Sequence, residues 1–252
     1  MIIPMFLSVI IPAYNEEKRI KNTLISVGDY LSKQRYEYEI IVVSDGSNDK
    51  TVEVVKAMEN QIRNLRVIDN KENHGKGWVV KQGMLEAKGD VRLFTDADNS
   101  TSINHIEKML LYFSAEGGSV SGGKEGYDIV IGSRRVSGSV ISVHQPWYKE
   151  ILGRAGNLLI RIFAVGGIND TQAGFKAFTA KAAEIIFSRL TLDRWGFDFE
   201  ALAVAKKYKL KIKEMPITWI NDAMSHVKLS AYIKTLFEAL KVRQNLITGK
   251  YN

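Results

Sequence analysis

The sequence predicts a doubly wound α/β fold, in which a mostly parallel sheet carries helices on both faces. Short, nearly continuous apolar runs alternate with segments of helical periodicity. Continuous apolar strands are typical of a sheet covered on both sides, and strand–helix alternation is typical of parallel sheets. The apolar runs are residues 6–12, 38–44, 65–69 and 91–94, and the helical segments are residues 16–32, 51–59 and 76–88.

Length and composition restrict the class of protein. With 252 residues and 45% hydrophobic content, the chain can bury a substantial core, which argues against disorder. It has no cysteine, so disulfides and cysteine-bound zinc are excluded. The formal net charge of +7 indicates an anionic partner. No helix-turn-helix, zinc-finger or RNA-recognition pattern is present, so we do not expect nucleic acid to be that partner.

A polar cluster follows each predicted strand. The clusters lie at or just beyond the ends of the first, second, third and fourth apolar runs and are PAYNEE, SDGSND, NHGKG and DADNS. In doubly wound sheets, ligands bind beyond the carboxyl ends of the strands, so these clusters are expected to meet at one edge. Local explanations exist as well, because Asn15 could cap the first helix and Asp45–Gly46 could form a tight turn.

Asp96 and Asp98, in the segment FTDADNST, are the candidate metal ligands. Two carboxylates this close repel each other unless a cation lies between them. Oxygen ligands of this kind suit Mg²⁺ or Mn²⁺, which take one or two carboxylates together with substrate phosphates. The alternative for DxD taken alone is a solvated turn. Its position at a strand end beside three other polar clusters favours the metal site.

Six segments taken in order resemble those of family 2 glycosyltransferases, which have the GT-A fold. The resemblance covers roughly residues 6–228 and is greatest to the polyprenyl-phosphate branch, to dolichyl-phosphate β-glucosyltransferases more than to dolichyl-phosphate mannose synthases. DTQAGFK and RWGFDFE favour the glucosyl group. The segments are SVIIPAYNEE, IIVVSDGSNDKT, NHGKGWVVKQGMLEAKGD, LFTDADNST, IVIGSRR and DTQAGFKAFT.

The resemblance implies roles for individual residues. Asp45 would read the uracil edge of the donor, and Lys76 would approach its phosphates. Arg134 and Arg154 match the arginines that hold the acceptor phosphate, whereas Arg135 is interpreted as a surface ion pair. The remaining donor residues would be Pro12, Ala13, Tyr14, Glu16, Asp96, Ala97 and Asp98, and residues near the sugar or a closing loop would be Gln172, Lys176, Trp195, Ser225 and Lys228.

The sequence departs from the family pattern at two places. Ser44 replaces the first of two aspartates that often precede Gly-Ser, which leaves Asp45 as the only candidate for base recognition there. Ser100 stands where some mannose synthases have a glutamine that ligates the metal, so we expect fewer protein ligands and more water on the ion.

The nature of the acceptor determines whether a general base is needed. A hydroxyl acceptor needs one to take its proton, whereas a phosphate monoester is already ionised near neutral pH, with a second pKa of about 6. The phosphate needs cations to position it, a role suited to arginine. Asp198 is a candidate catalytic residue on the acceptor side, with Glu200 as the alternative, although acids in the first turn of a helix are favoured by its dipole alone.

Two amphipathic stretches predict contact with a membrane surface. One is residues 151–163 and the other is residues 229–243; both place apolar side chains at helical spacing among basic residues. We therefore divide the chain into a catalytic domain, residues 1–225, and a helical segment, residues 226–252, that could dock on an anionic membrane. No run of about 18 apolar residues occurs, so we expect a cytoplasmic, peripherally bound protein without a transmembrane helix.

The resulting hypothesis is an inverting transferase that moves glucose from UDP-glucose to a polyprenyl phosphate of the dolichyl type. The first alternative is transfer of mannose from GDP-mannose to the same acceptor. A second is a soluble transferase that uses a hydroxyl acceptor and would depend on Asp198 or Glu200 as base. The third, from a different class, is a non-catalytic nucleotide-sugar binder or membrane-surface protein, against which the intact Asp96 and Asp98 argue.

Overall fold

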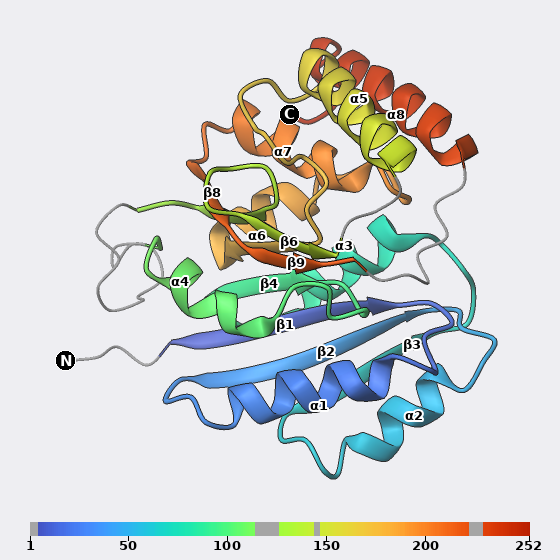
Figure 1. Cartoon of the computed structure of the whole chain (residues 1–252), viewed down its shortest axis with the longest axis vertical. Helices are drawn as coiled ribbons and strands as arrows, with labels where there is room; N and C mark the ends of the chain where they lie inside the picture. The colour runs from blue at the N-terminus through green and yellow to red at the C-terminus, as the bar shows by residue number, and fades with distance from the viewer. Residues whose placement is uncertain (1–4, 114–125, 144–146, 222–228) are drawn as a thin grey trace.

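The computed structural model describes residues 5–113, 126–143, 147–221 and 229–252, which form a seven-stranded sheet with helices on both faces (Figure 1). The strand order is β3-β2-β1-β4-β7-β5-β8, and only β7 runs antiparallel to its neighbours. The prediction of a doubly wound, mostly parallel sheet is confirmed. The strands are β1 (Phe6–Ala13), β2 (Glu37–Asp45), β3 (Leu65–Asn70), β4 (Val91–Thr95), β5 (Ile129–Ser133), β7 (Phe175–Thr179) and β8 (Ile212–Pro216), with β6 (Val140–Val143) and β9 (Thr218–Ile220) paired in a small second sheet.

Two hydrophobic cores, one on each face, explain why the strands are apolar without alternation. In β1, Ile10 points into one core while Val9 and Ile11 point into the other, and all three are fully buried. The core around Ile10 is covered by α3 (Lys76–Glu86), α6 (Ala180–Phe187) and α7 (Phe197–Lys207). The other is covered by α1 (Ile20–Leu31), α2 (Thr51–Met58), the short η1 (Ile103–His105) and α4 (Ile106–Leu110). Every central strand therefore buries both of its faces.

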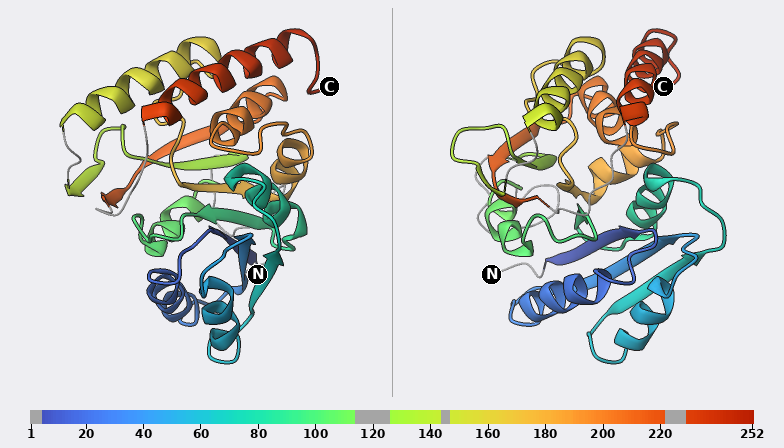
Figure 2. Two further views of the ribbon diagram at one scale, coloured as in Figure 1. Left: turned by 90° about the vertical axis from the view of Figure 1, so that its right-hand side faces the viewer. Right: turned by 45° about the vertical axis from the view of Figure 1, so that its right-hand side comes forward.

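The helices α5 (Trp147–Phe163) and α8 (Leu229–Ile247) form an additional layer outside α7. They lie side by side in all three ribbon views (Figures 1 and 2) and pack against each other. Ala239 and Val242 of α8 belong to the same buried core as α6 and α7. The proposed boundary between residues 225 and 226 lies outside the described residues, so the division into two parts stays a prediction.

The first helix begins later than the sequence indicates, at Ile20 rather than near Glu16. The prediction that Asn15 caps it is wrong, because no side chain caps this helix. Asn15 instead adopts a left-handed backbone with φ 55°, and its side-chain oxygen accepts a hydrogen bond from the backbone N–H of Asn48 at 2.9 Å. Its own N–H donates to Ser47 Oγ at 3.1 Å. The loops after β1 and β2 are thus cross-linked at the carboxyl edge of the sheet.

Much of the predicted apolar surface of α5 and α8 is exposed. Ile162 is 64% exposed on α5, and Phe237 is 67% exposed on α8. Phe163 and Leu236 are partly buried, and the side chains of Leu229 and Ile233 lie outside the description. Within the described ranges, no helix is both long and apolar enough to cross a bilayer. The other exposed apolar residues here are Ile151, Leu152, Leu158, Leu159, Leu240 and Ile247.

Replacing Tyr251 by Phe should lower the free energy of unfolding by about 1–3 kcal/mol, because the hydroxyl hydrogen-bonds a charged, buried group. The Tyr251 hydroxyl donates to Glu200 Oε1 at 2.7 Å and accepts from Asn245 Nδ2 at 3.1 Å. Urea denaturation measures the change. Ile247→Ala, at an exposed position, is the control and should change stability by less than about 0.5 kcal/mol. Equal stabilities for Tyr251→Phe and wild type would mean that this contact does not anchor the C-terminus.

Candidate active site

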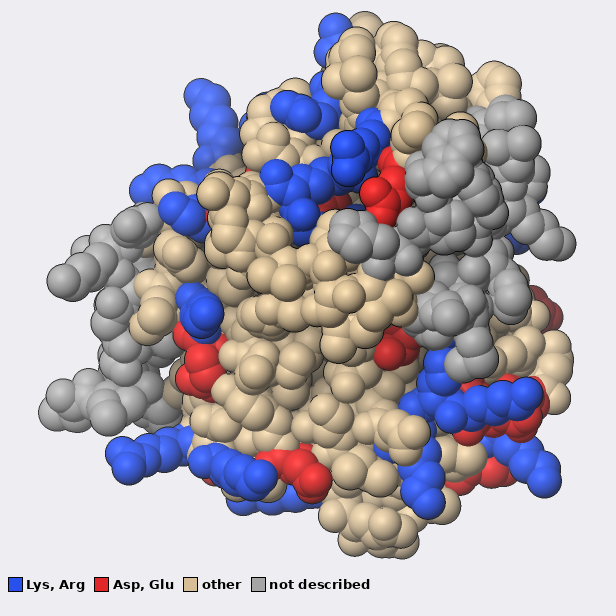
Figure 3. Space-filling view, in the orientation of Figure 1, with Lys and Arg blue, Asp and Glu red and all other residues tan. Residues whose placement is uncertain are grey.

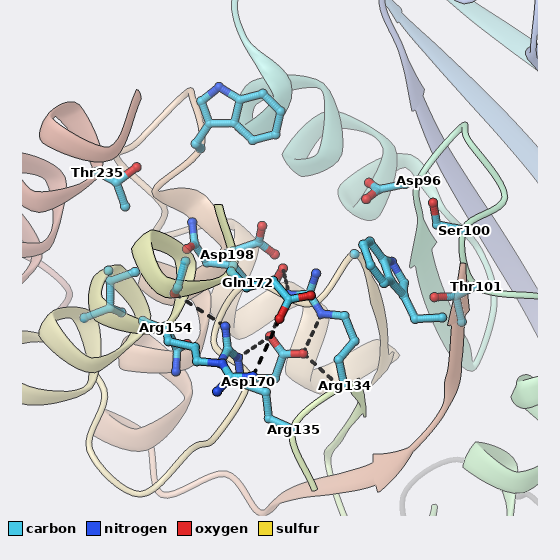
Figure 4. Close-up of a pocket in the computed structure, with 18 of the residues that line it drawn as sticks. Asp96, Ser100, Thr101, Arg134, Arg135, Arg154, Asp170, Gln172, Asp198 and Thr235 are labelled. Atoms are coloured by element: carbon cyan, nitrogen blue, oxygen red, sulfur yellow. Dashed lines mark hydrogen bonds and ion pairs between the residues drawn. The ribbon is translucent and has the colours of Figure 1, made fainter. Parts of the chain in front are cut away.

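A cavity of about 720 Å³ opens at the carboxyl ends of β4 and β5. Its walls include the residues after these two strands, the segment before β7, the first turns of α3 and α7, and one side of α5, together with side chains from β6, β9 and α8 (Figure 4). The cavity therefore lies where the parallel topology places polar strand ends together. Carboxylates and arginines both line it, in separate groups.

The acidic group consists of Asp96 and Asp98, directly after β4. The Ser100 N–H donates to Asp98 Oδ1 at 2.9 Å, which fixes that carboxylate. Burial, and next the charge of Asp96, raise the pKa of Asp98. A side chain at Gly174 would displace the Asp96 carboxylate, because a Cβ at that position would lie 2.0 Å from Asp96 Oδ2. The Asp96 carboxylate therefore packs against the backbone of Gly174. The backbone N–H of Asp96 donates to the Gly174 carbonyl at 3.2 Å.

Lys76, the first residue of α3, supplies a positive charge to this group. Its Nζ lies 2.6 Å from Asp96 Oδ1 and 5.1 Å from the centre of the half-exposed Trp195 ring. Burial alone would lower the pKa of Lys76, but the charges of Asp96 and Asp198 outweigh burial and raise it. Lys76 is therefore a firmly protonated cation beside the carboxylate pair.

The basic group is organised around Asp170, which is 1% exposed. Arg134 donates to it through Nε and one terminal nitrogen, both at 2.8 Å, and through its backbone N–H at 2.9 Å. Burial alone would raise the pKa of Asp170, but Arg134 lowers it to about 2. Figure 4 shows Arg134, Arg135 and Arg154 gathered around Asp170, away from Asp96. The ion pair is formed by residues 36 apart in the chain.

Arg135 and Arg154 complete the basic group. Arg154 extends from α5 with a side chain that is 73% exposed, and it lies 3.7 Å from Glu150. Arg135 lines the same cavity, with its terminal nitrogen 3.4 Å from the Gly153 carbonyl and its Nε 4.0 Å from Asp170. The interpretation of Arg135 as a surface ion pair is thus incomplete, because the structure places it in the cavity.

Asp198 and Glu200 are separated by the structure, although both lie in the first turn of α7. Asp198 lines the cavity and pairs with the buried Lys176 at 2.5 Å. Burial raises the pKa of Asp198, while Lys176 acts in the opposite direction. Glu200 is fully buried and accepts from Thr191 and Leu192 N–H groups and from the Tyr251 hydroxyl. Glu200 is therefore a structural residue, which leaves Asp198 as the acid of this pair that faces the cavity.

Comparison with known proteins identifies the family. The model for "Glycosyl transferase family 2" matches residues 8–179, which include both strands that carry the acidic and basic groups. The chain belongs to this family. It is 36% identical over 250 residues to a dolichyl-phosphate beta-glucosyltransferase of Trichomonas vaginalis, covering 94% of this chain and 73% of the relative. It is 31% identical to the human dolichyl-phosphate beta-glucosyltransferase, covering 97% of this chain and 77% of that one.

Solved structures show that this family 2 glycosyltransferase has the GT-A fold. Mannosyl-3-phosphoglycerate synthase from Rubrobacter xylanophilus aligns with a TM-score of 0.68 and 16% identity, over 98% of this chain and 75% of that chain. Glucosyl-3-phosphoglycerate synthase from Mycobacterium tuberculosis, in complex with Mn²⁺, UDP-glucose and phosphoglyceric acid, aligns with a TM-score of 0.66 and 19% identity, over 95% and 80%. The GT-A prediction is confirmed.

The carboxylates present fit a divalent metal with few protein ligands. Asp96 and Asp98 face the cavity together, and the cost of holding two partly buried carboxylates side by side is what a cation would relieve. No group of three metal-ligating acids or histidines occurs among the described residues. Two carboxylates plus substrate phosphates and water is the arrangement that Mg²⁺ accepts. Asp96 and Asp98 are thus the residues that would hold the ion.

The predicted base-binding residues lie at the ends of β1 and β2, outside the lining of this cavity. Tyr14 is exposed, whereas Pro12 and Ala13 are buried. The Asp45 carboxylate accepts from the backbone N–H groups of His74 and Gly75 at 2.7–3.1 Å. It therefore positions the loop that leads into Lys76. A role for Asp45 in reading uracil stays a prediction.

The remaining predicted residues are divided between the cavity and other parts of the chain. Gln172 and Trp195 line it directly, while Lys176 lies behind Asp198. Glu16 is tied to Arg19 by an ion pair at 2.6 Å at the end of β1. The predictions for Ser225 and Lys228 lie outside the described residues.

Two residues that sequence reasoning missed hold the segment before β7. Besides Asp170, Asn157 of α5 accepts from the Thr171 N–H at 3.2 Å and hydroxyl at 2.8 Å, and its amide donates to the Asn169 carbonyl at 2.8 Å. The available signals were an asparagine inside an amphipathic helix and the aspartate that begins the segment DTQAG. Neither indicates a partner, because the partners are 12 or more residues away.

Replacing Gly174 by Ala should weaken Mn²⁺ binding at least about tenfold, since the added methyl group displaces the Asp96 carboxylate and overpacking of this size costs about 1–3 kcal/mol. Calorimetric titration with Mn²⁺ in the presence of UDP measures the affinity. Gly166→Ala is the matched control, because the nearest atom to its added Cβ is 3.7 Å away. If Gly174→Ala binds Mn²⁺ with wild-type affinity, Asp96 is not a ligand of the metal.

Proposed function

We propose that this family 2 glycosyltransferase transfers glucose from UDP-glucose to a polyprenyl phosphate of the dolichyl type, with inversion at the anomeric carbon. The observation that carries the proposal is the division of one cavity into a carboxylate group, Asp96 and Asp98, and an arginine group around Asp170. The first suits a metal-bound diphosphate, and the second suits an anionic acceptor. The names of the relatives, dolichyl-phosphate beta-glucosyltransferases, support the choice of sugar and lipid.

The donor side uses residues at the ends of β1 and β2 and after β4. Asp45 would read the base, Lys76 would contact the phosphates from the start of α3, and the residues that flank base and ribose would be Pro12, Ala13, Tyr14 and Glu16. A bound Mg²⁺ or Mn²⁺ on Asp96 and Asp98 supplies neutralisation of charge on the departing diphosphate. Lys76 contributes a second positive charge on the same side, since its Nζ is 2.6 Å from Asp96.

The acceptor side supports a nucleophile that is already ionised. A phosphate oxygen of the lipid attacks the anomeric carbon, a new C–O bond forms, and the bond from that carbon to the diphosphate breaks with its electron pair leaving on UDP. No proton has to be removed from the phosphate dianion. The acid of α7 that lines the cavity, Asp198, is paired with Lys176 at 2.5 Å, so one of its oxygens already accepts from the protein. An ionised phosphate acceptor needs no base from this residue.

The exposed apolar side chains of α5 and α8 support docking on an anionic membrane surface. Ile162 and Phe237 are among the most exposed large apolar residues, and Lys234, Lys241 and Arg243 are exposed on α8. In Figure 3, the uppermost part of the molecule, over these helices, shows a wide uncharged area with basic side chains at its edge. Apolar insertion and attraction to anionic lipids act together in such surfaces. The cavity opens beside α5, which would bring the lipid phosphate to the arginines.

Incubation with polyprenyl phosphate, Mg²⁺ and radiolabelled UDP-glucose should place label in the organic phase after lipid extraction, and excess EDTA should prevent it. Asp98→Ala should abolish transfer while thermal unfolding shows a folded protein, because the ligand pair is broken but no core contact is lost. GDP-mannose serves as the competing donor. If only GDP-mannose labels the lipid, the transferred sugar is mannose and not glucose. Full activity in excess EDTA would show that transfer does not require a metal. Transfer to a water-soluble alcohol in place of the lipid would contradict the acceptor class.

The double variant Ile162→Glu with Phe237→Glu should bind phosphatidylserine vesicles at least about tenfold more weakly than wild type, because two apolar contacts are lost and two like charges are added. Wild-type binding should itself weaken as salt rises. Vesicle sedimentation measures both effects. Leu111→Glu, at a residue 62% exposed next to α4, is the control and should bind as wild type does. Equal binding by all three proteins would show that α5 and α8 do not contact the membrane.

A further inference from the structure

Lys176 is a lysine inside the core of the main sheet. It lies in β7 between the fully buried Phe175 and Ala177, and it is itself only 1% exposed. The residues opposite it on the neighbouring strands are Phe94 of β4 and Ile131 of β5. A lysine is almost never buried to this extent unless it is paired, because its ammonium group loses its hydration. The Nζ atom therefore needs specific partners within the protein.

The Nζ atom of Lys176 has two partners that belong to different segments. It donates to the Ala173 carbonyl and to Asp198 Oδ1, each at 2.5 Å. Ala173 belongs to the segment before β7, and Asp198 belongs to the first turn of α7. Both segments line the cavity. One buried ammonium group thus connects two walls of the cavity.

The first partner lies next to the residue that supports Asp96, one of the two proposed metal ligands. Gly174 follows Ala173, its carbonyl accepts from the Asp96 N–H at 3.2 Å, and its backbone packs against the Asp96 carboxylate. The carbonyl of Ala173 and the Cα of Gly174 belong to the same planar peptide unit, so neither can move without the other. The contact from Lys176 to Ala173 therefore also fixes the support of Asp96.

The second partner, Asp198, is a carboxylate whose charge depends on nearby cations. Burial raises the pKa of Asp198, and the charges of Lys176 and then Lys76 oppose that rise. Lys76 in turn lies 2.6 Å from Asp96. Two ion pairs, one formed by Lys176 and one by Lys76, thus lie near each other in this part of the cavity. Lys176 holds Asp198 in place and favours its charged form.

We propose that Lys176 is a positioning residue for the transfer reaction, which holds Gly174 behind Asp96 and holds Asp198 at the cavity wall with the same ammonium group. This inference rests on the proposed function for the reaction that is measured, whereas its effect on the metal site can be measured without transfer. A buried ion pair that served stability alone could be replaced by neutral side chains at little cost. Replacement of a positioning pair should change metal binding and kcat as well.

A charge-balanced double variant tests the contact to Ala173. Lys176→Met together with Asp198→Asn removes one positive and one negative charge, so the net charge near the cavity is unchanged. This variant should bind Mn²⁺ in the presence of UDP at least about fivefold more weakly than wild type, because the charge-assisted hydrogen bond that secures Ala173 is lost. Calorimetric titration measures the affinity, and thermal unfolding shows whether the variant is folded.

The matched control is Arg92→Met together with Glu184→Gln. Arg92 is also a buried cation of the sheet, 7% exposed, which donates to the Met84 carbonyl at 2.6 Å and to Glu184 of α6 at 2.7 Å. It lies near the amino end of β4, whereas Asp96 follows the carboxyl end of that strand. The control should keep Mn²⁺ affinity and kcat within about twofold of wild type, since the two sites are independent.

Transfer kinetics at saturating Mn²⁺ test the contact to Asp198. Lys176→Met and Asp198→Asn should each lower kcat at least about tenfold and change the KM for polyprenyl phosphate much less, because the arginine group is retained. If Lys176 acts on transfer through Asp198, the double variant should lose no more than the slower single variant, whereas independent roles would multiply the losses. Multiplied losses, or wild-type kcat in a folded Lys176→Met, would overturn the inference. Should Lys176→Met not fold, Mn²⁺ binding by the double variant decides.

The outcomes distinguish this inference from the proposed function. A wild-type protein that binds Mn²⁺ with UDP but transfers no sugar to polyprenyl phosphate would overturn the proposed function, and the Mn²⁺ titrations would still decide the role of Lys176. Equal Mn²⁺ affinity in wild type and in the Lys176→Met, Asp198→Asn variant would overturn the inference and leave the proposed function standing.

Discussion

The ion pair between Arg134 and Asp170 is the contact on which the geometry of the cavity depends. Asp170 is buried, and its segment is held from two further directions, by Glu214 of β8 at 2.8–2.9 Å and by Asn157 of α5. Four residues later the chain reaches Gly174, which supports Asp96 from behind. Removing one partner of a buried pair typically costs about 3–5 kcal/mol, because the other charge is left without compensation. Loss of this pair would therefore disturb the acidic group as well as the basic one.

The cavity keeps its charges apart, and this separation has an energetic cost that substrates can offset. On the acidic side, burial and mutual repulsion raise the pKa of Asp98, so a cation is favoured there. On the basic side, burial and neighbouring arginines lower the pKa of Arg135, so an anion is favoured. Lys76 and Lys176 limit the imbalance by pairing with Asp96 and Asp198. A cavity that favours a cation on one side and an anion on the other is suited to bring a metal-bound diphosphate next to a second phosphate.

How much the sequence predicts depends on whether the relevant interaction is local or long-range. The strands and the place of the DxD segment are local features, since an apolar run and the polar residues after it are adjacent in the chain. The structure confirms the strands and places Asp96 and Asp98 directly after β4. The choice between Asp198 and Glu200 depends on long-range contacts. Glu200 accepts hydrogen bonds from Thr191 and from Tyr251, which is 51 residues away, and these contacts give it a structural role. The cap predicted for Asn15 failed for the same reason: its oxygen bonds Asn48 across the sheet edge. Arg135 was assigned to the surface because nothing near it in sequence indicates α5.

Helix α5 links the proposed membrane surface to the proposed site of chemistry. Ile162 is exposed on one side, Ile160 is buried in the core, and Gly153, Arg154 and Leu159 face the cavity. A lipid phosphate anchored in a bilayer cannot leave its headgroup region without exposing its hydrocarbon chain to water, at about 0.8 kcal/mol for each CH₂. With the proposed acceptor, the enzyme would have to bring its cations to the membrane surface. A single helix that is apolar on its outer side and basic toward the cavity would meet this requirement, and it would account for an arginine group built against α5 while the predicted donor residues lie at the ends of β1, β2 and β4.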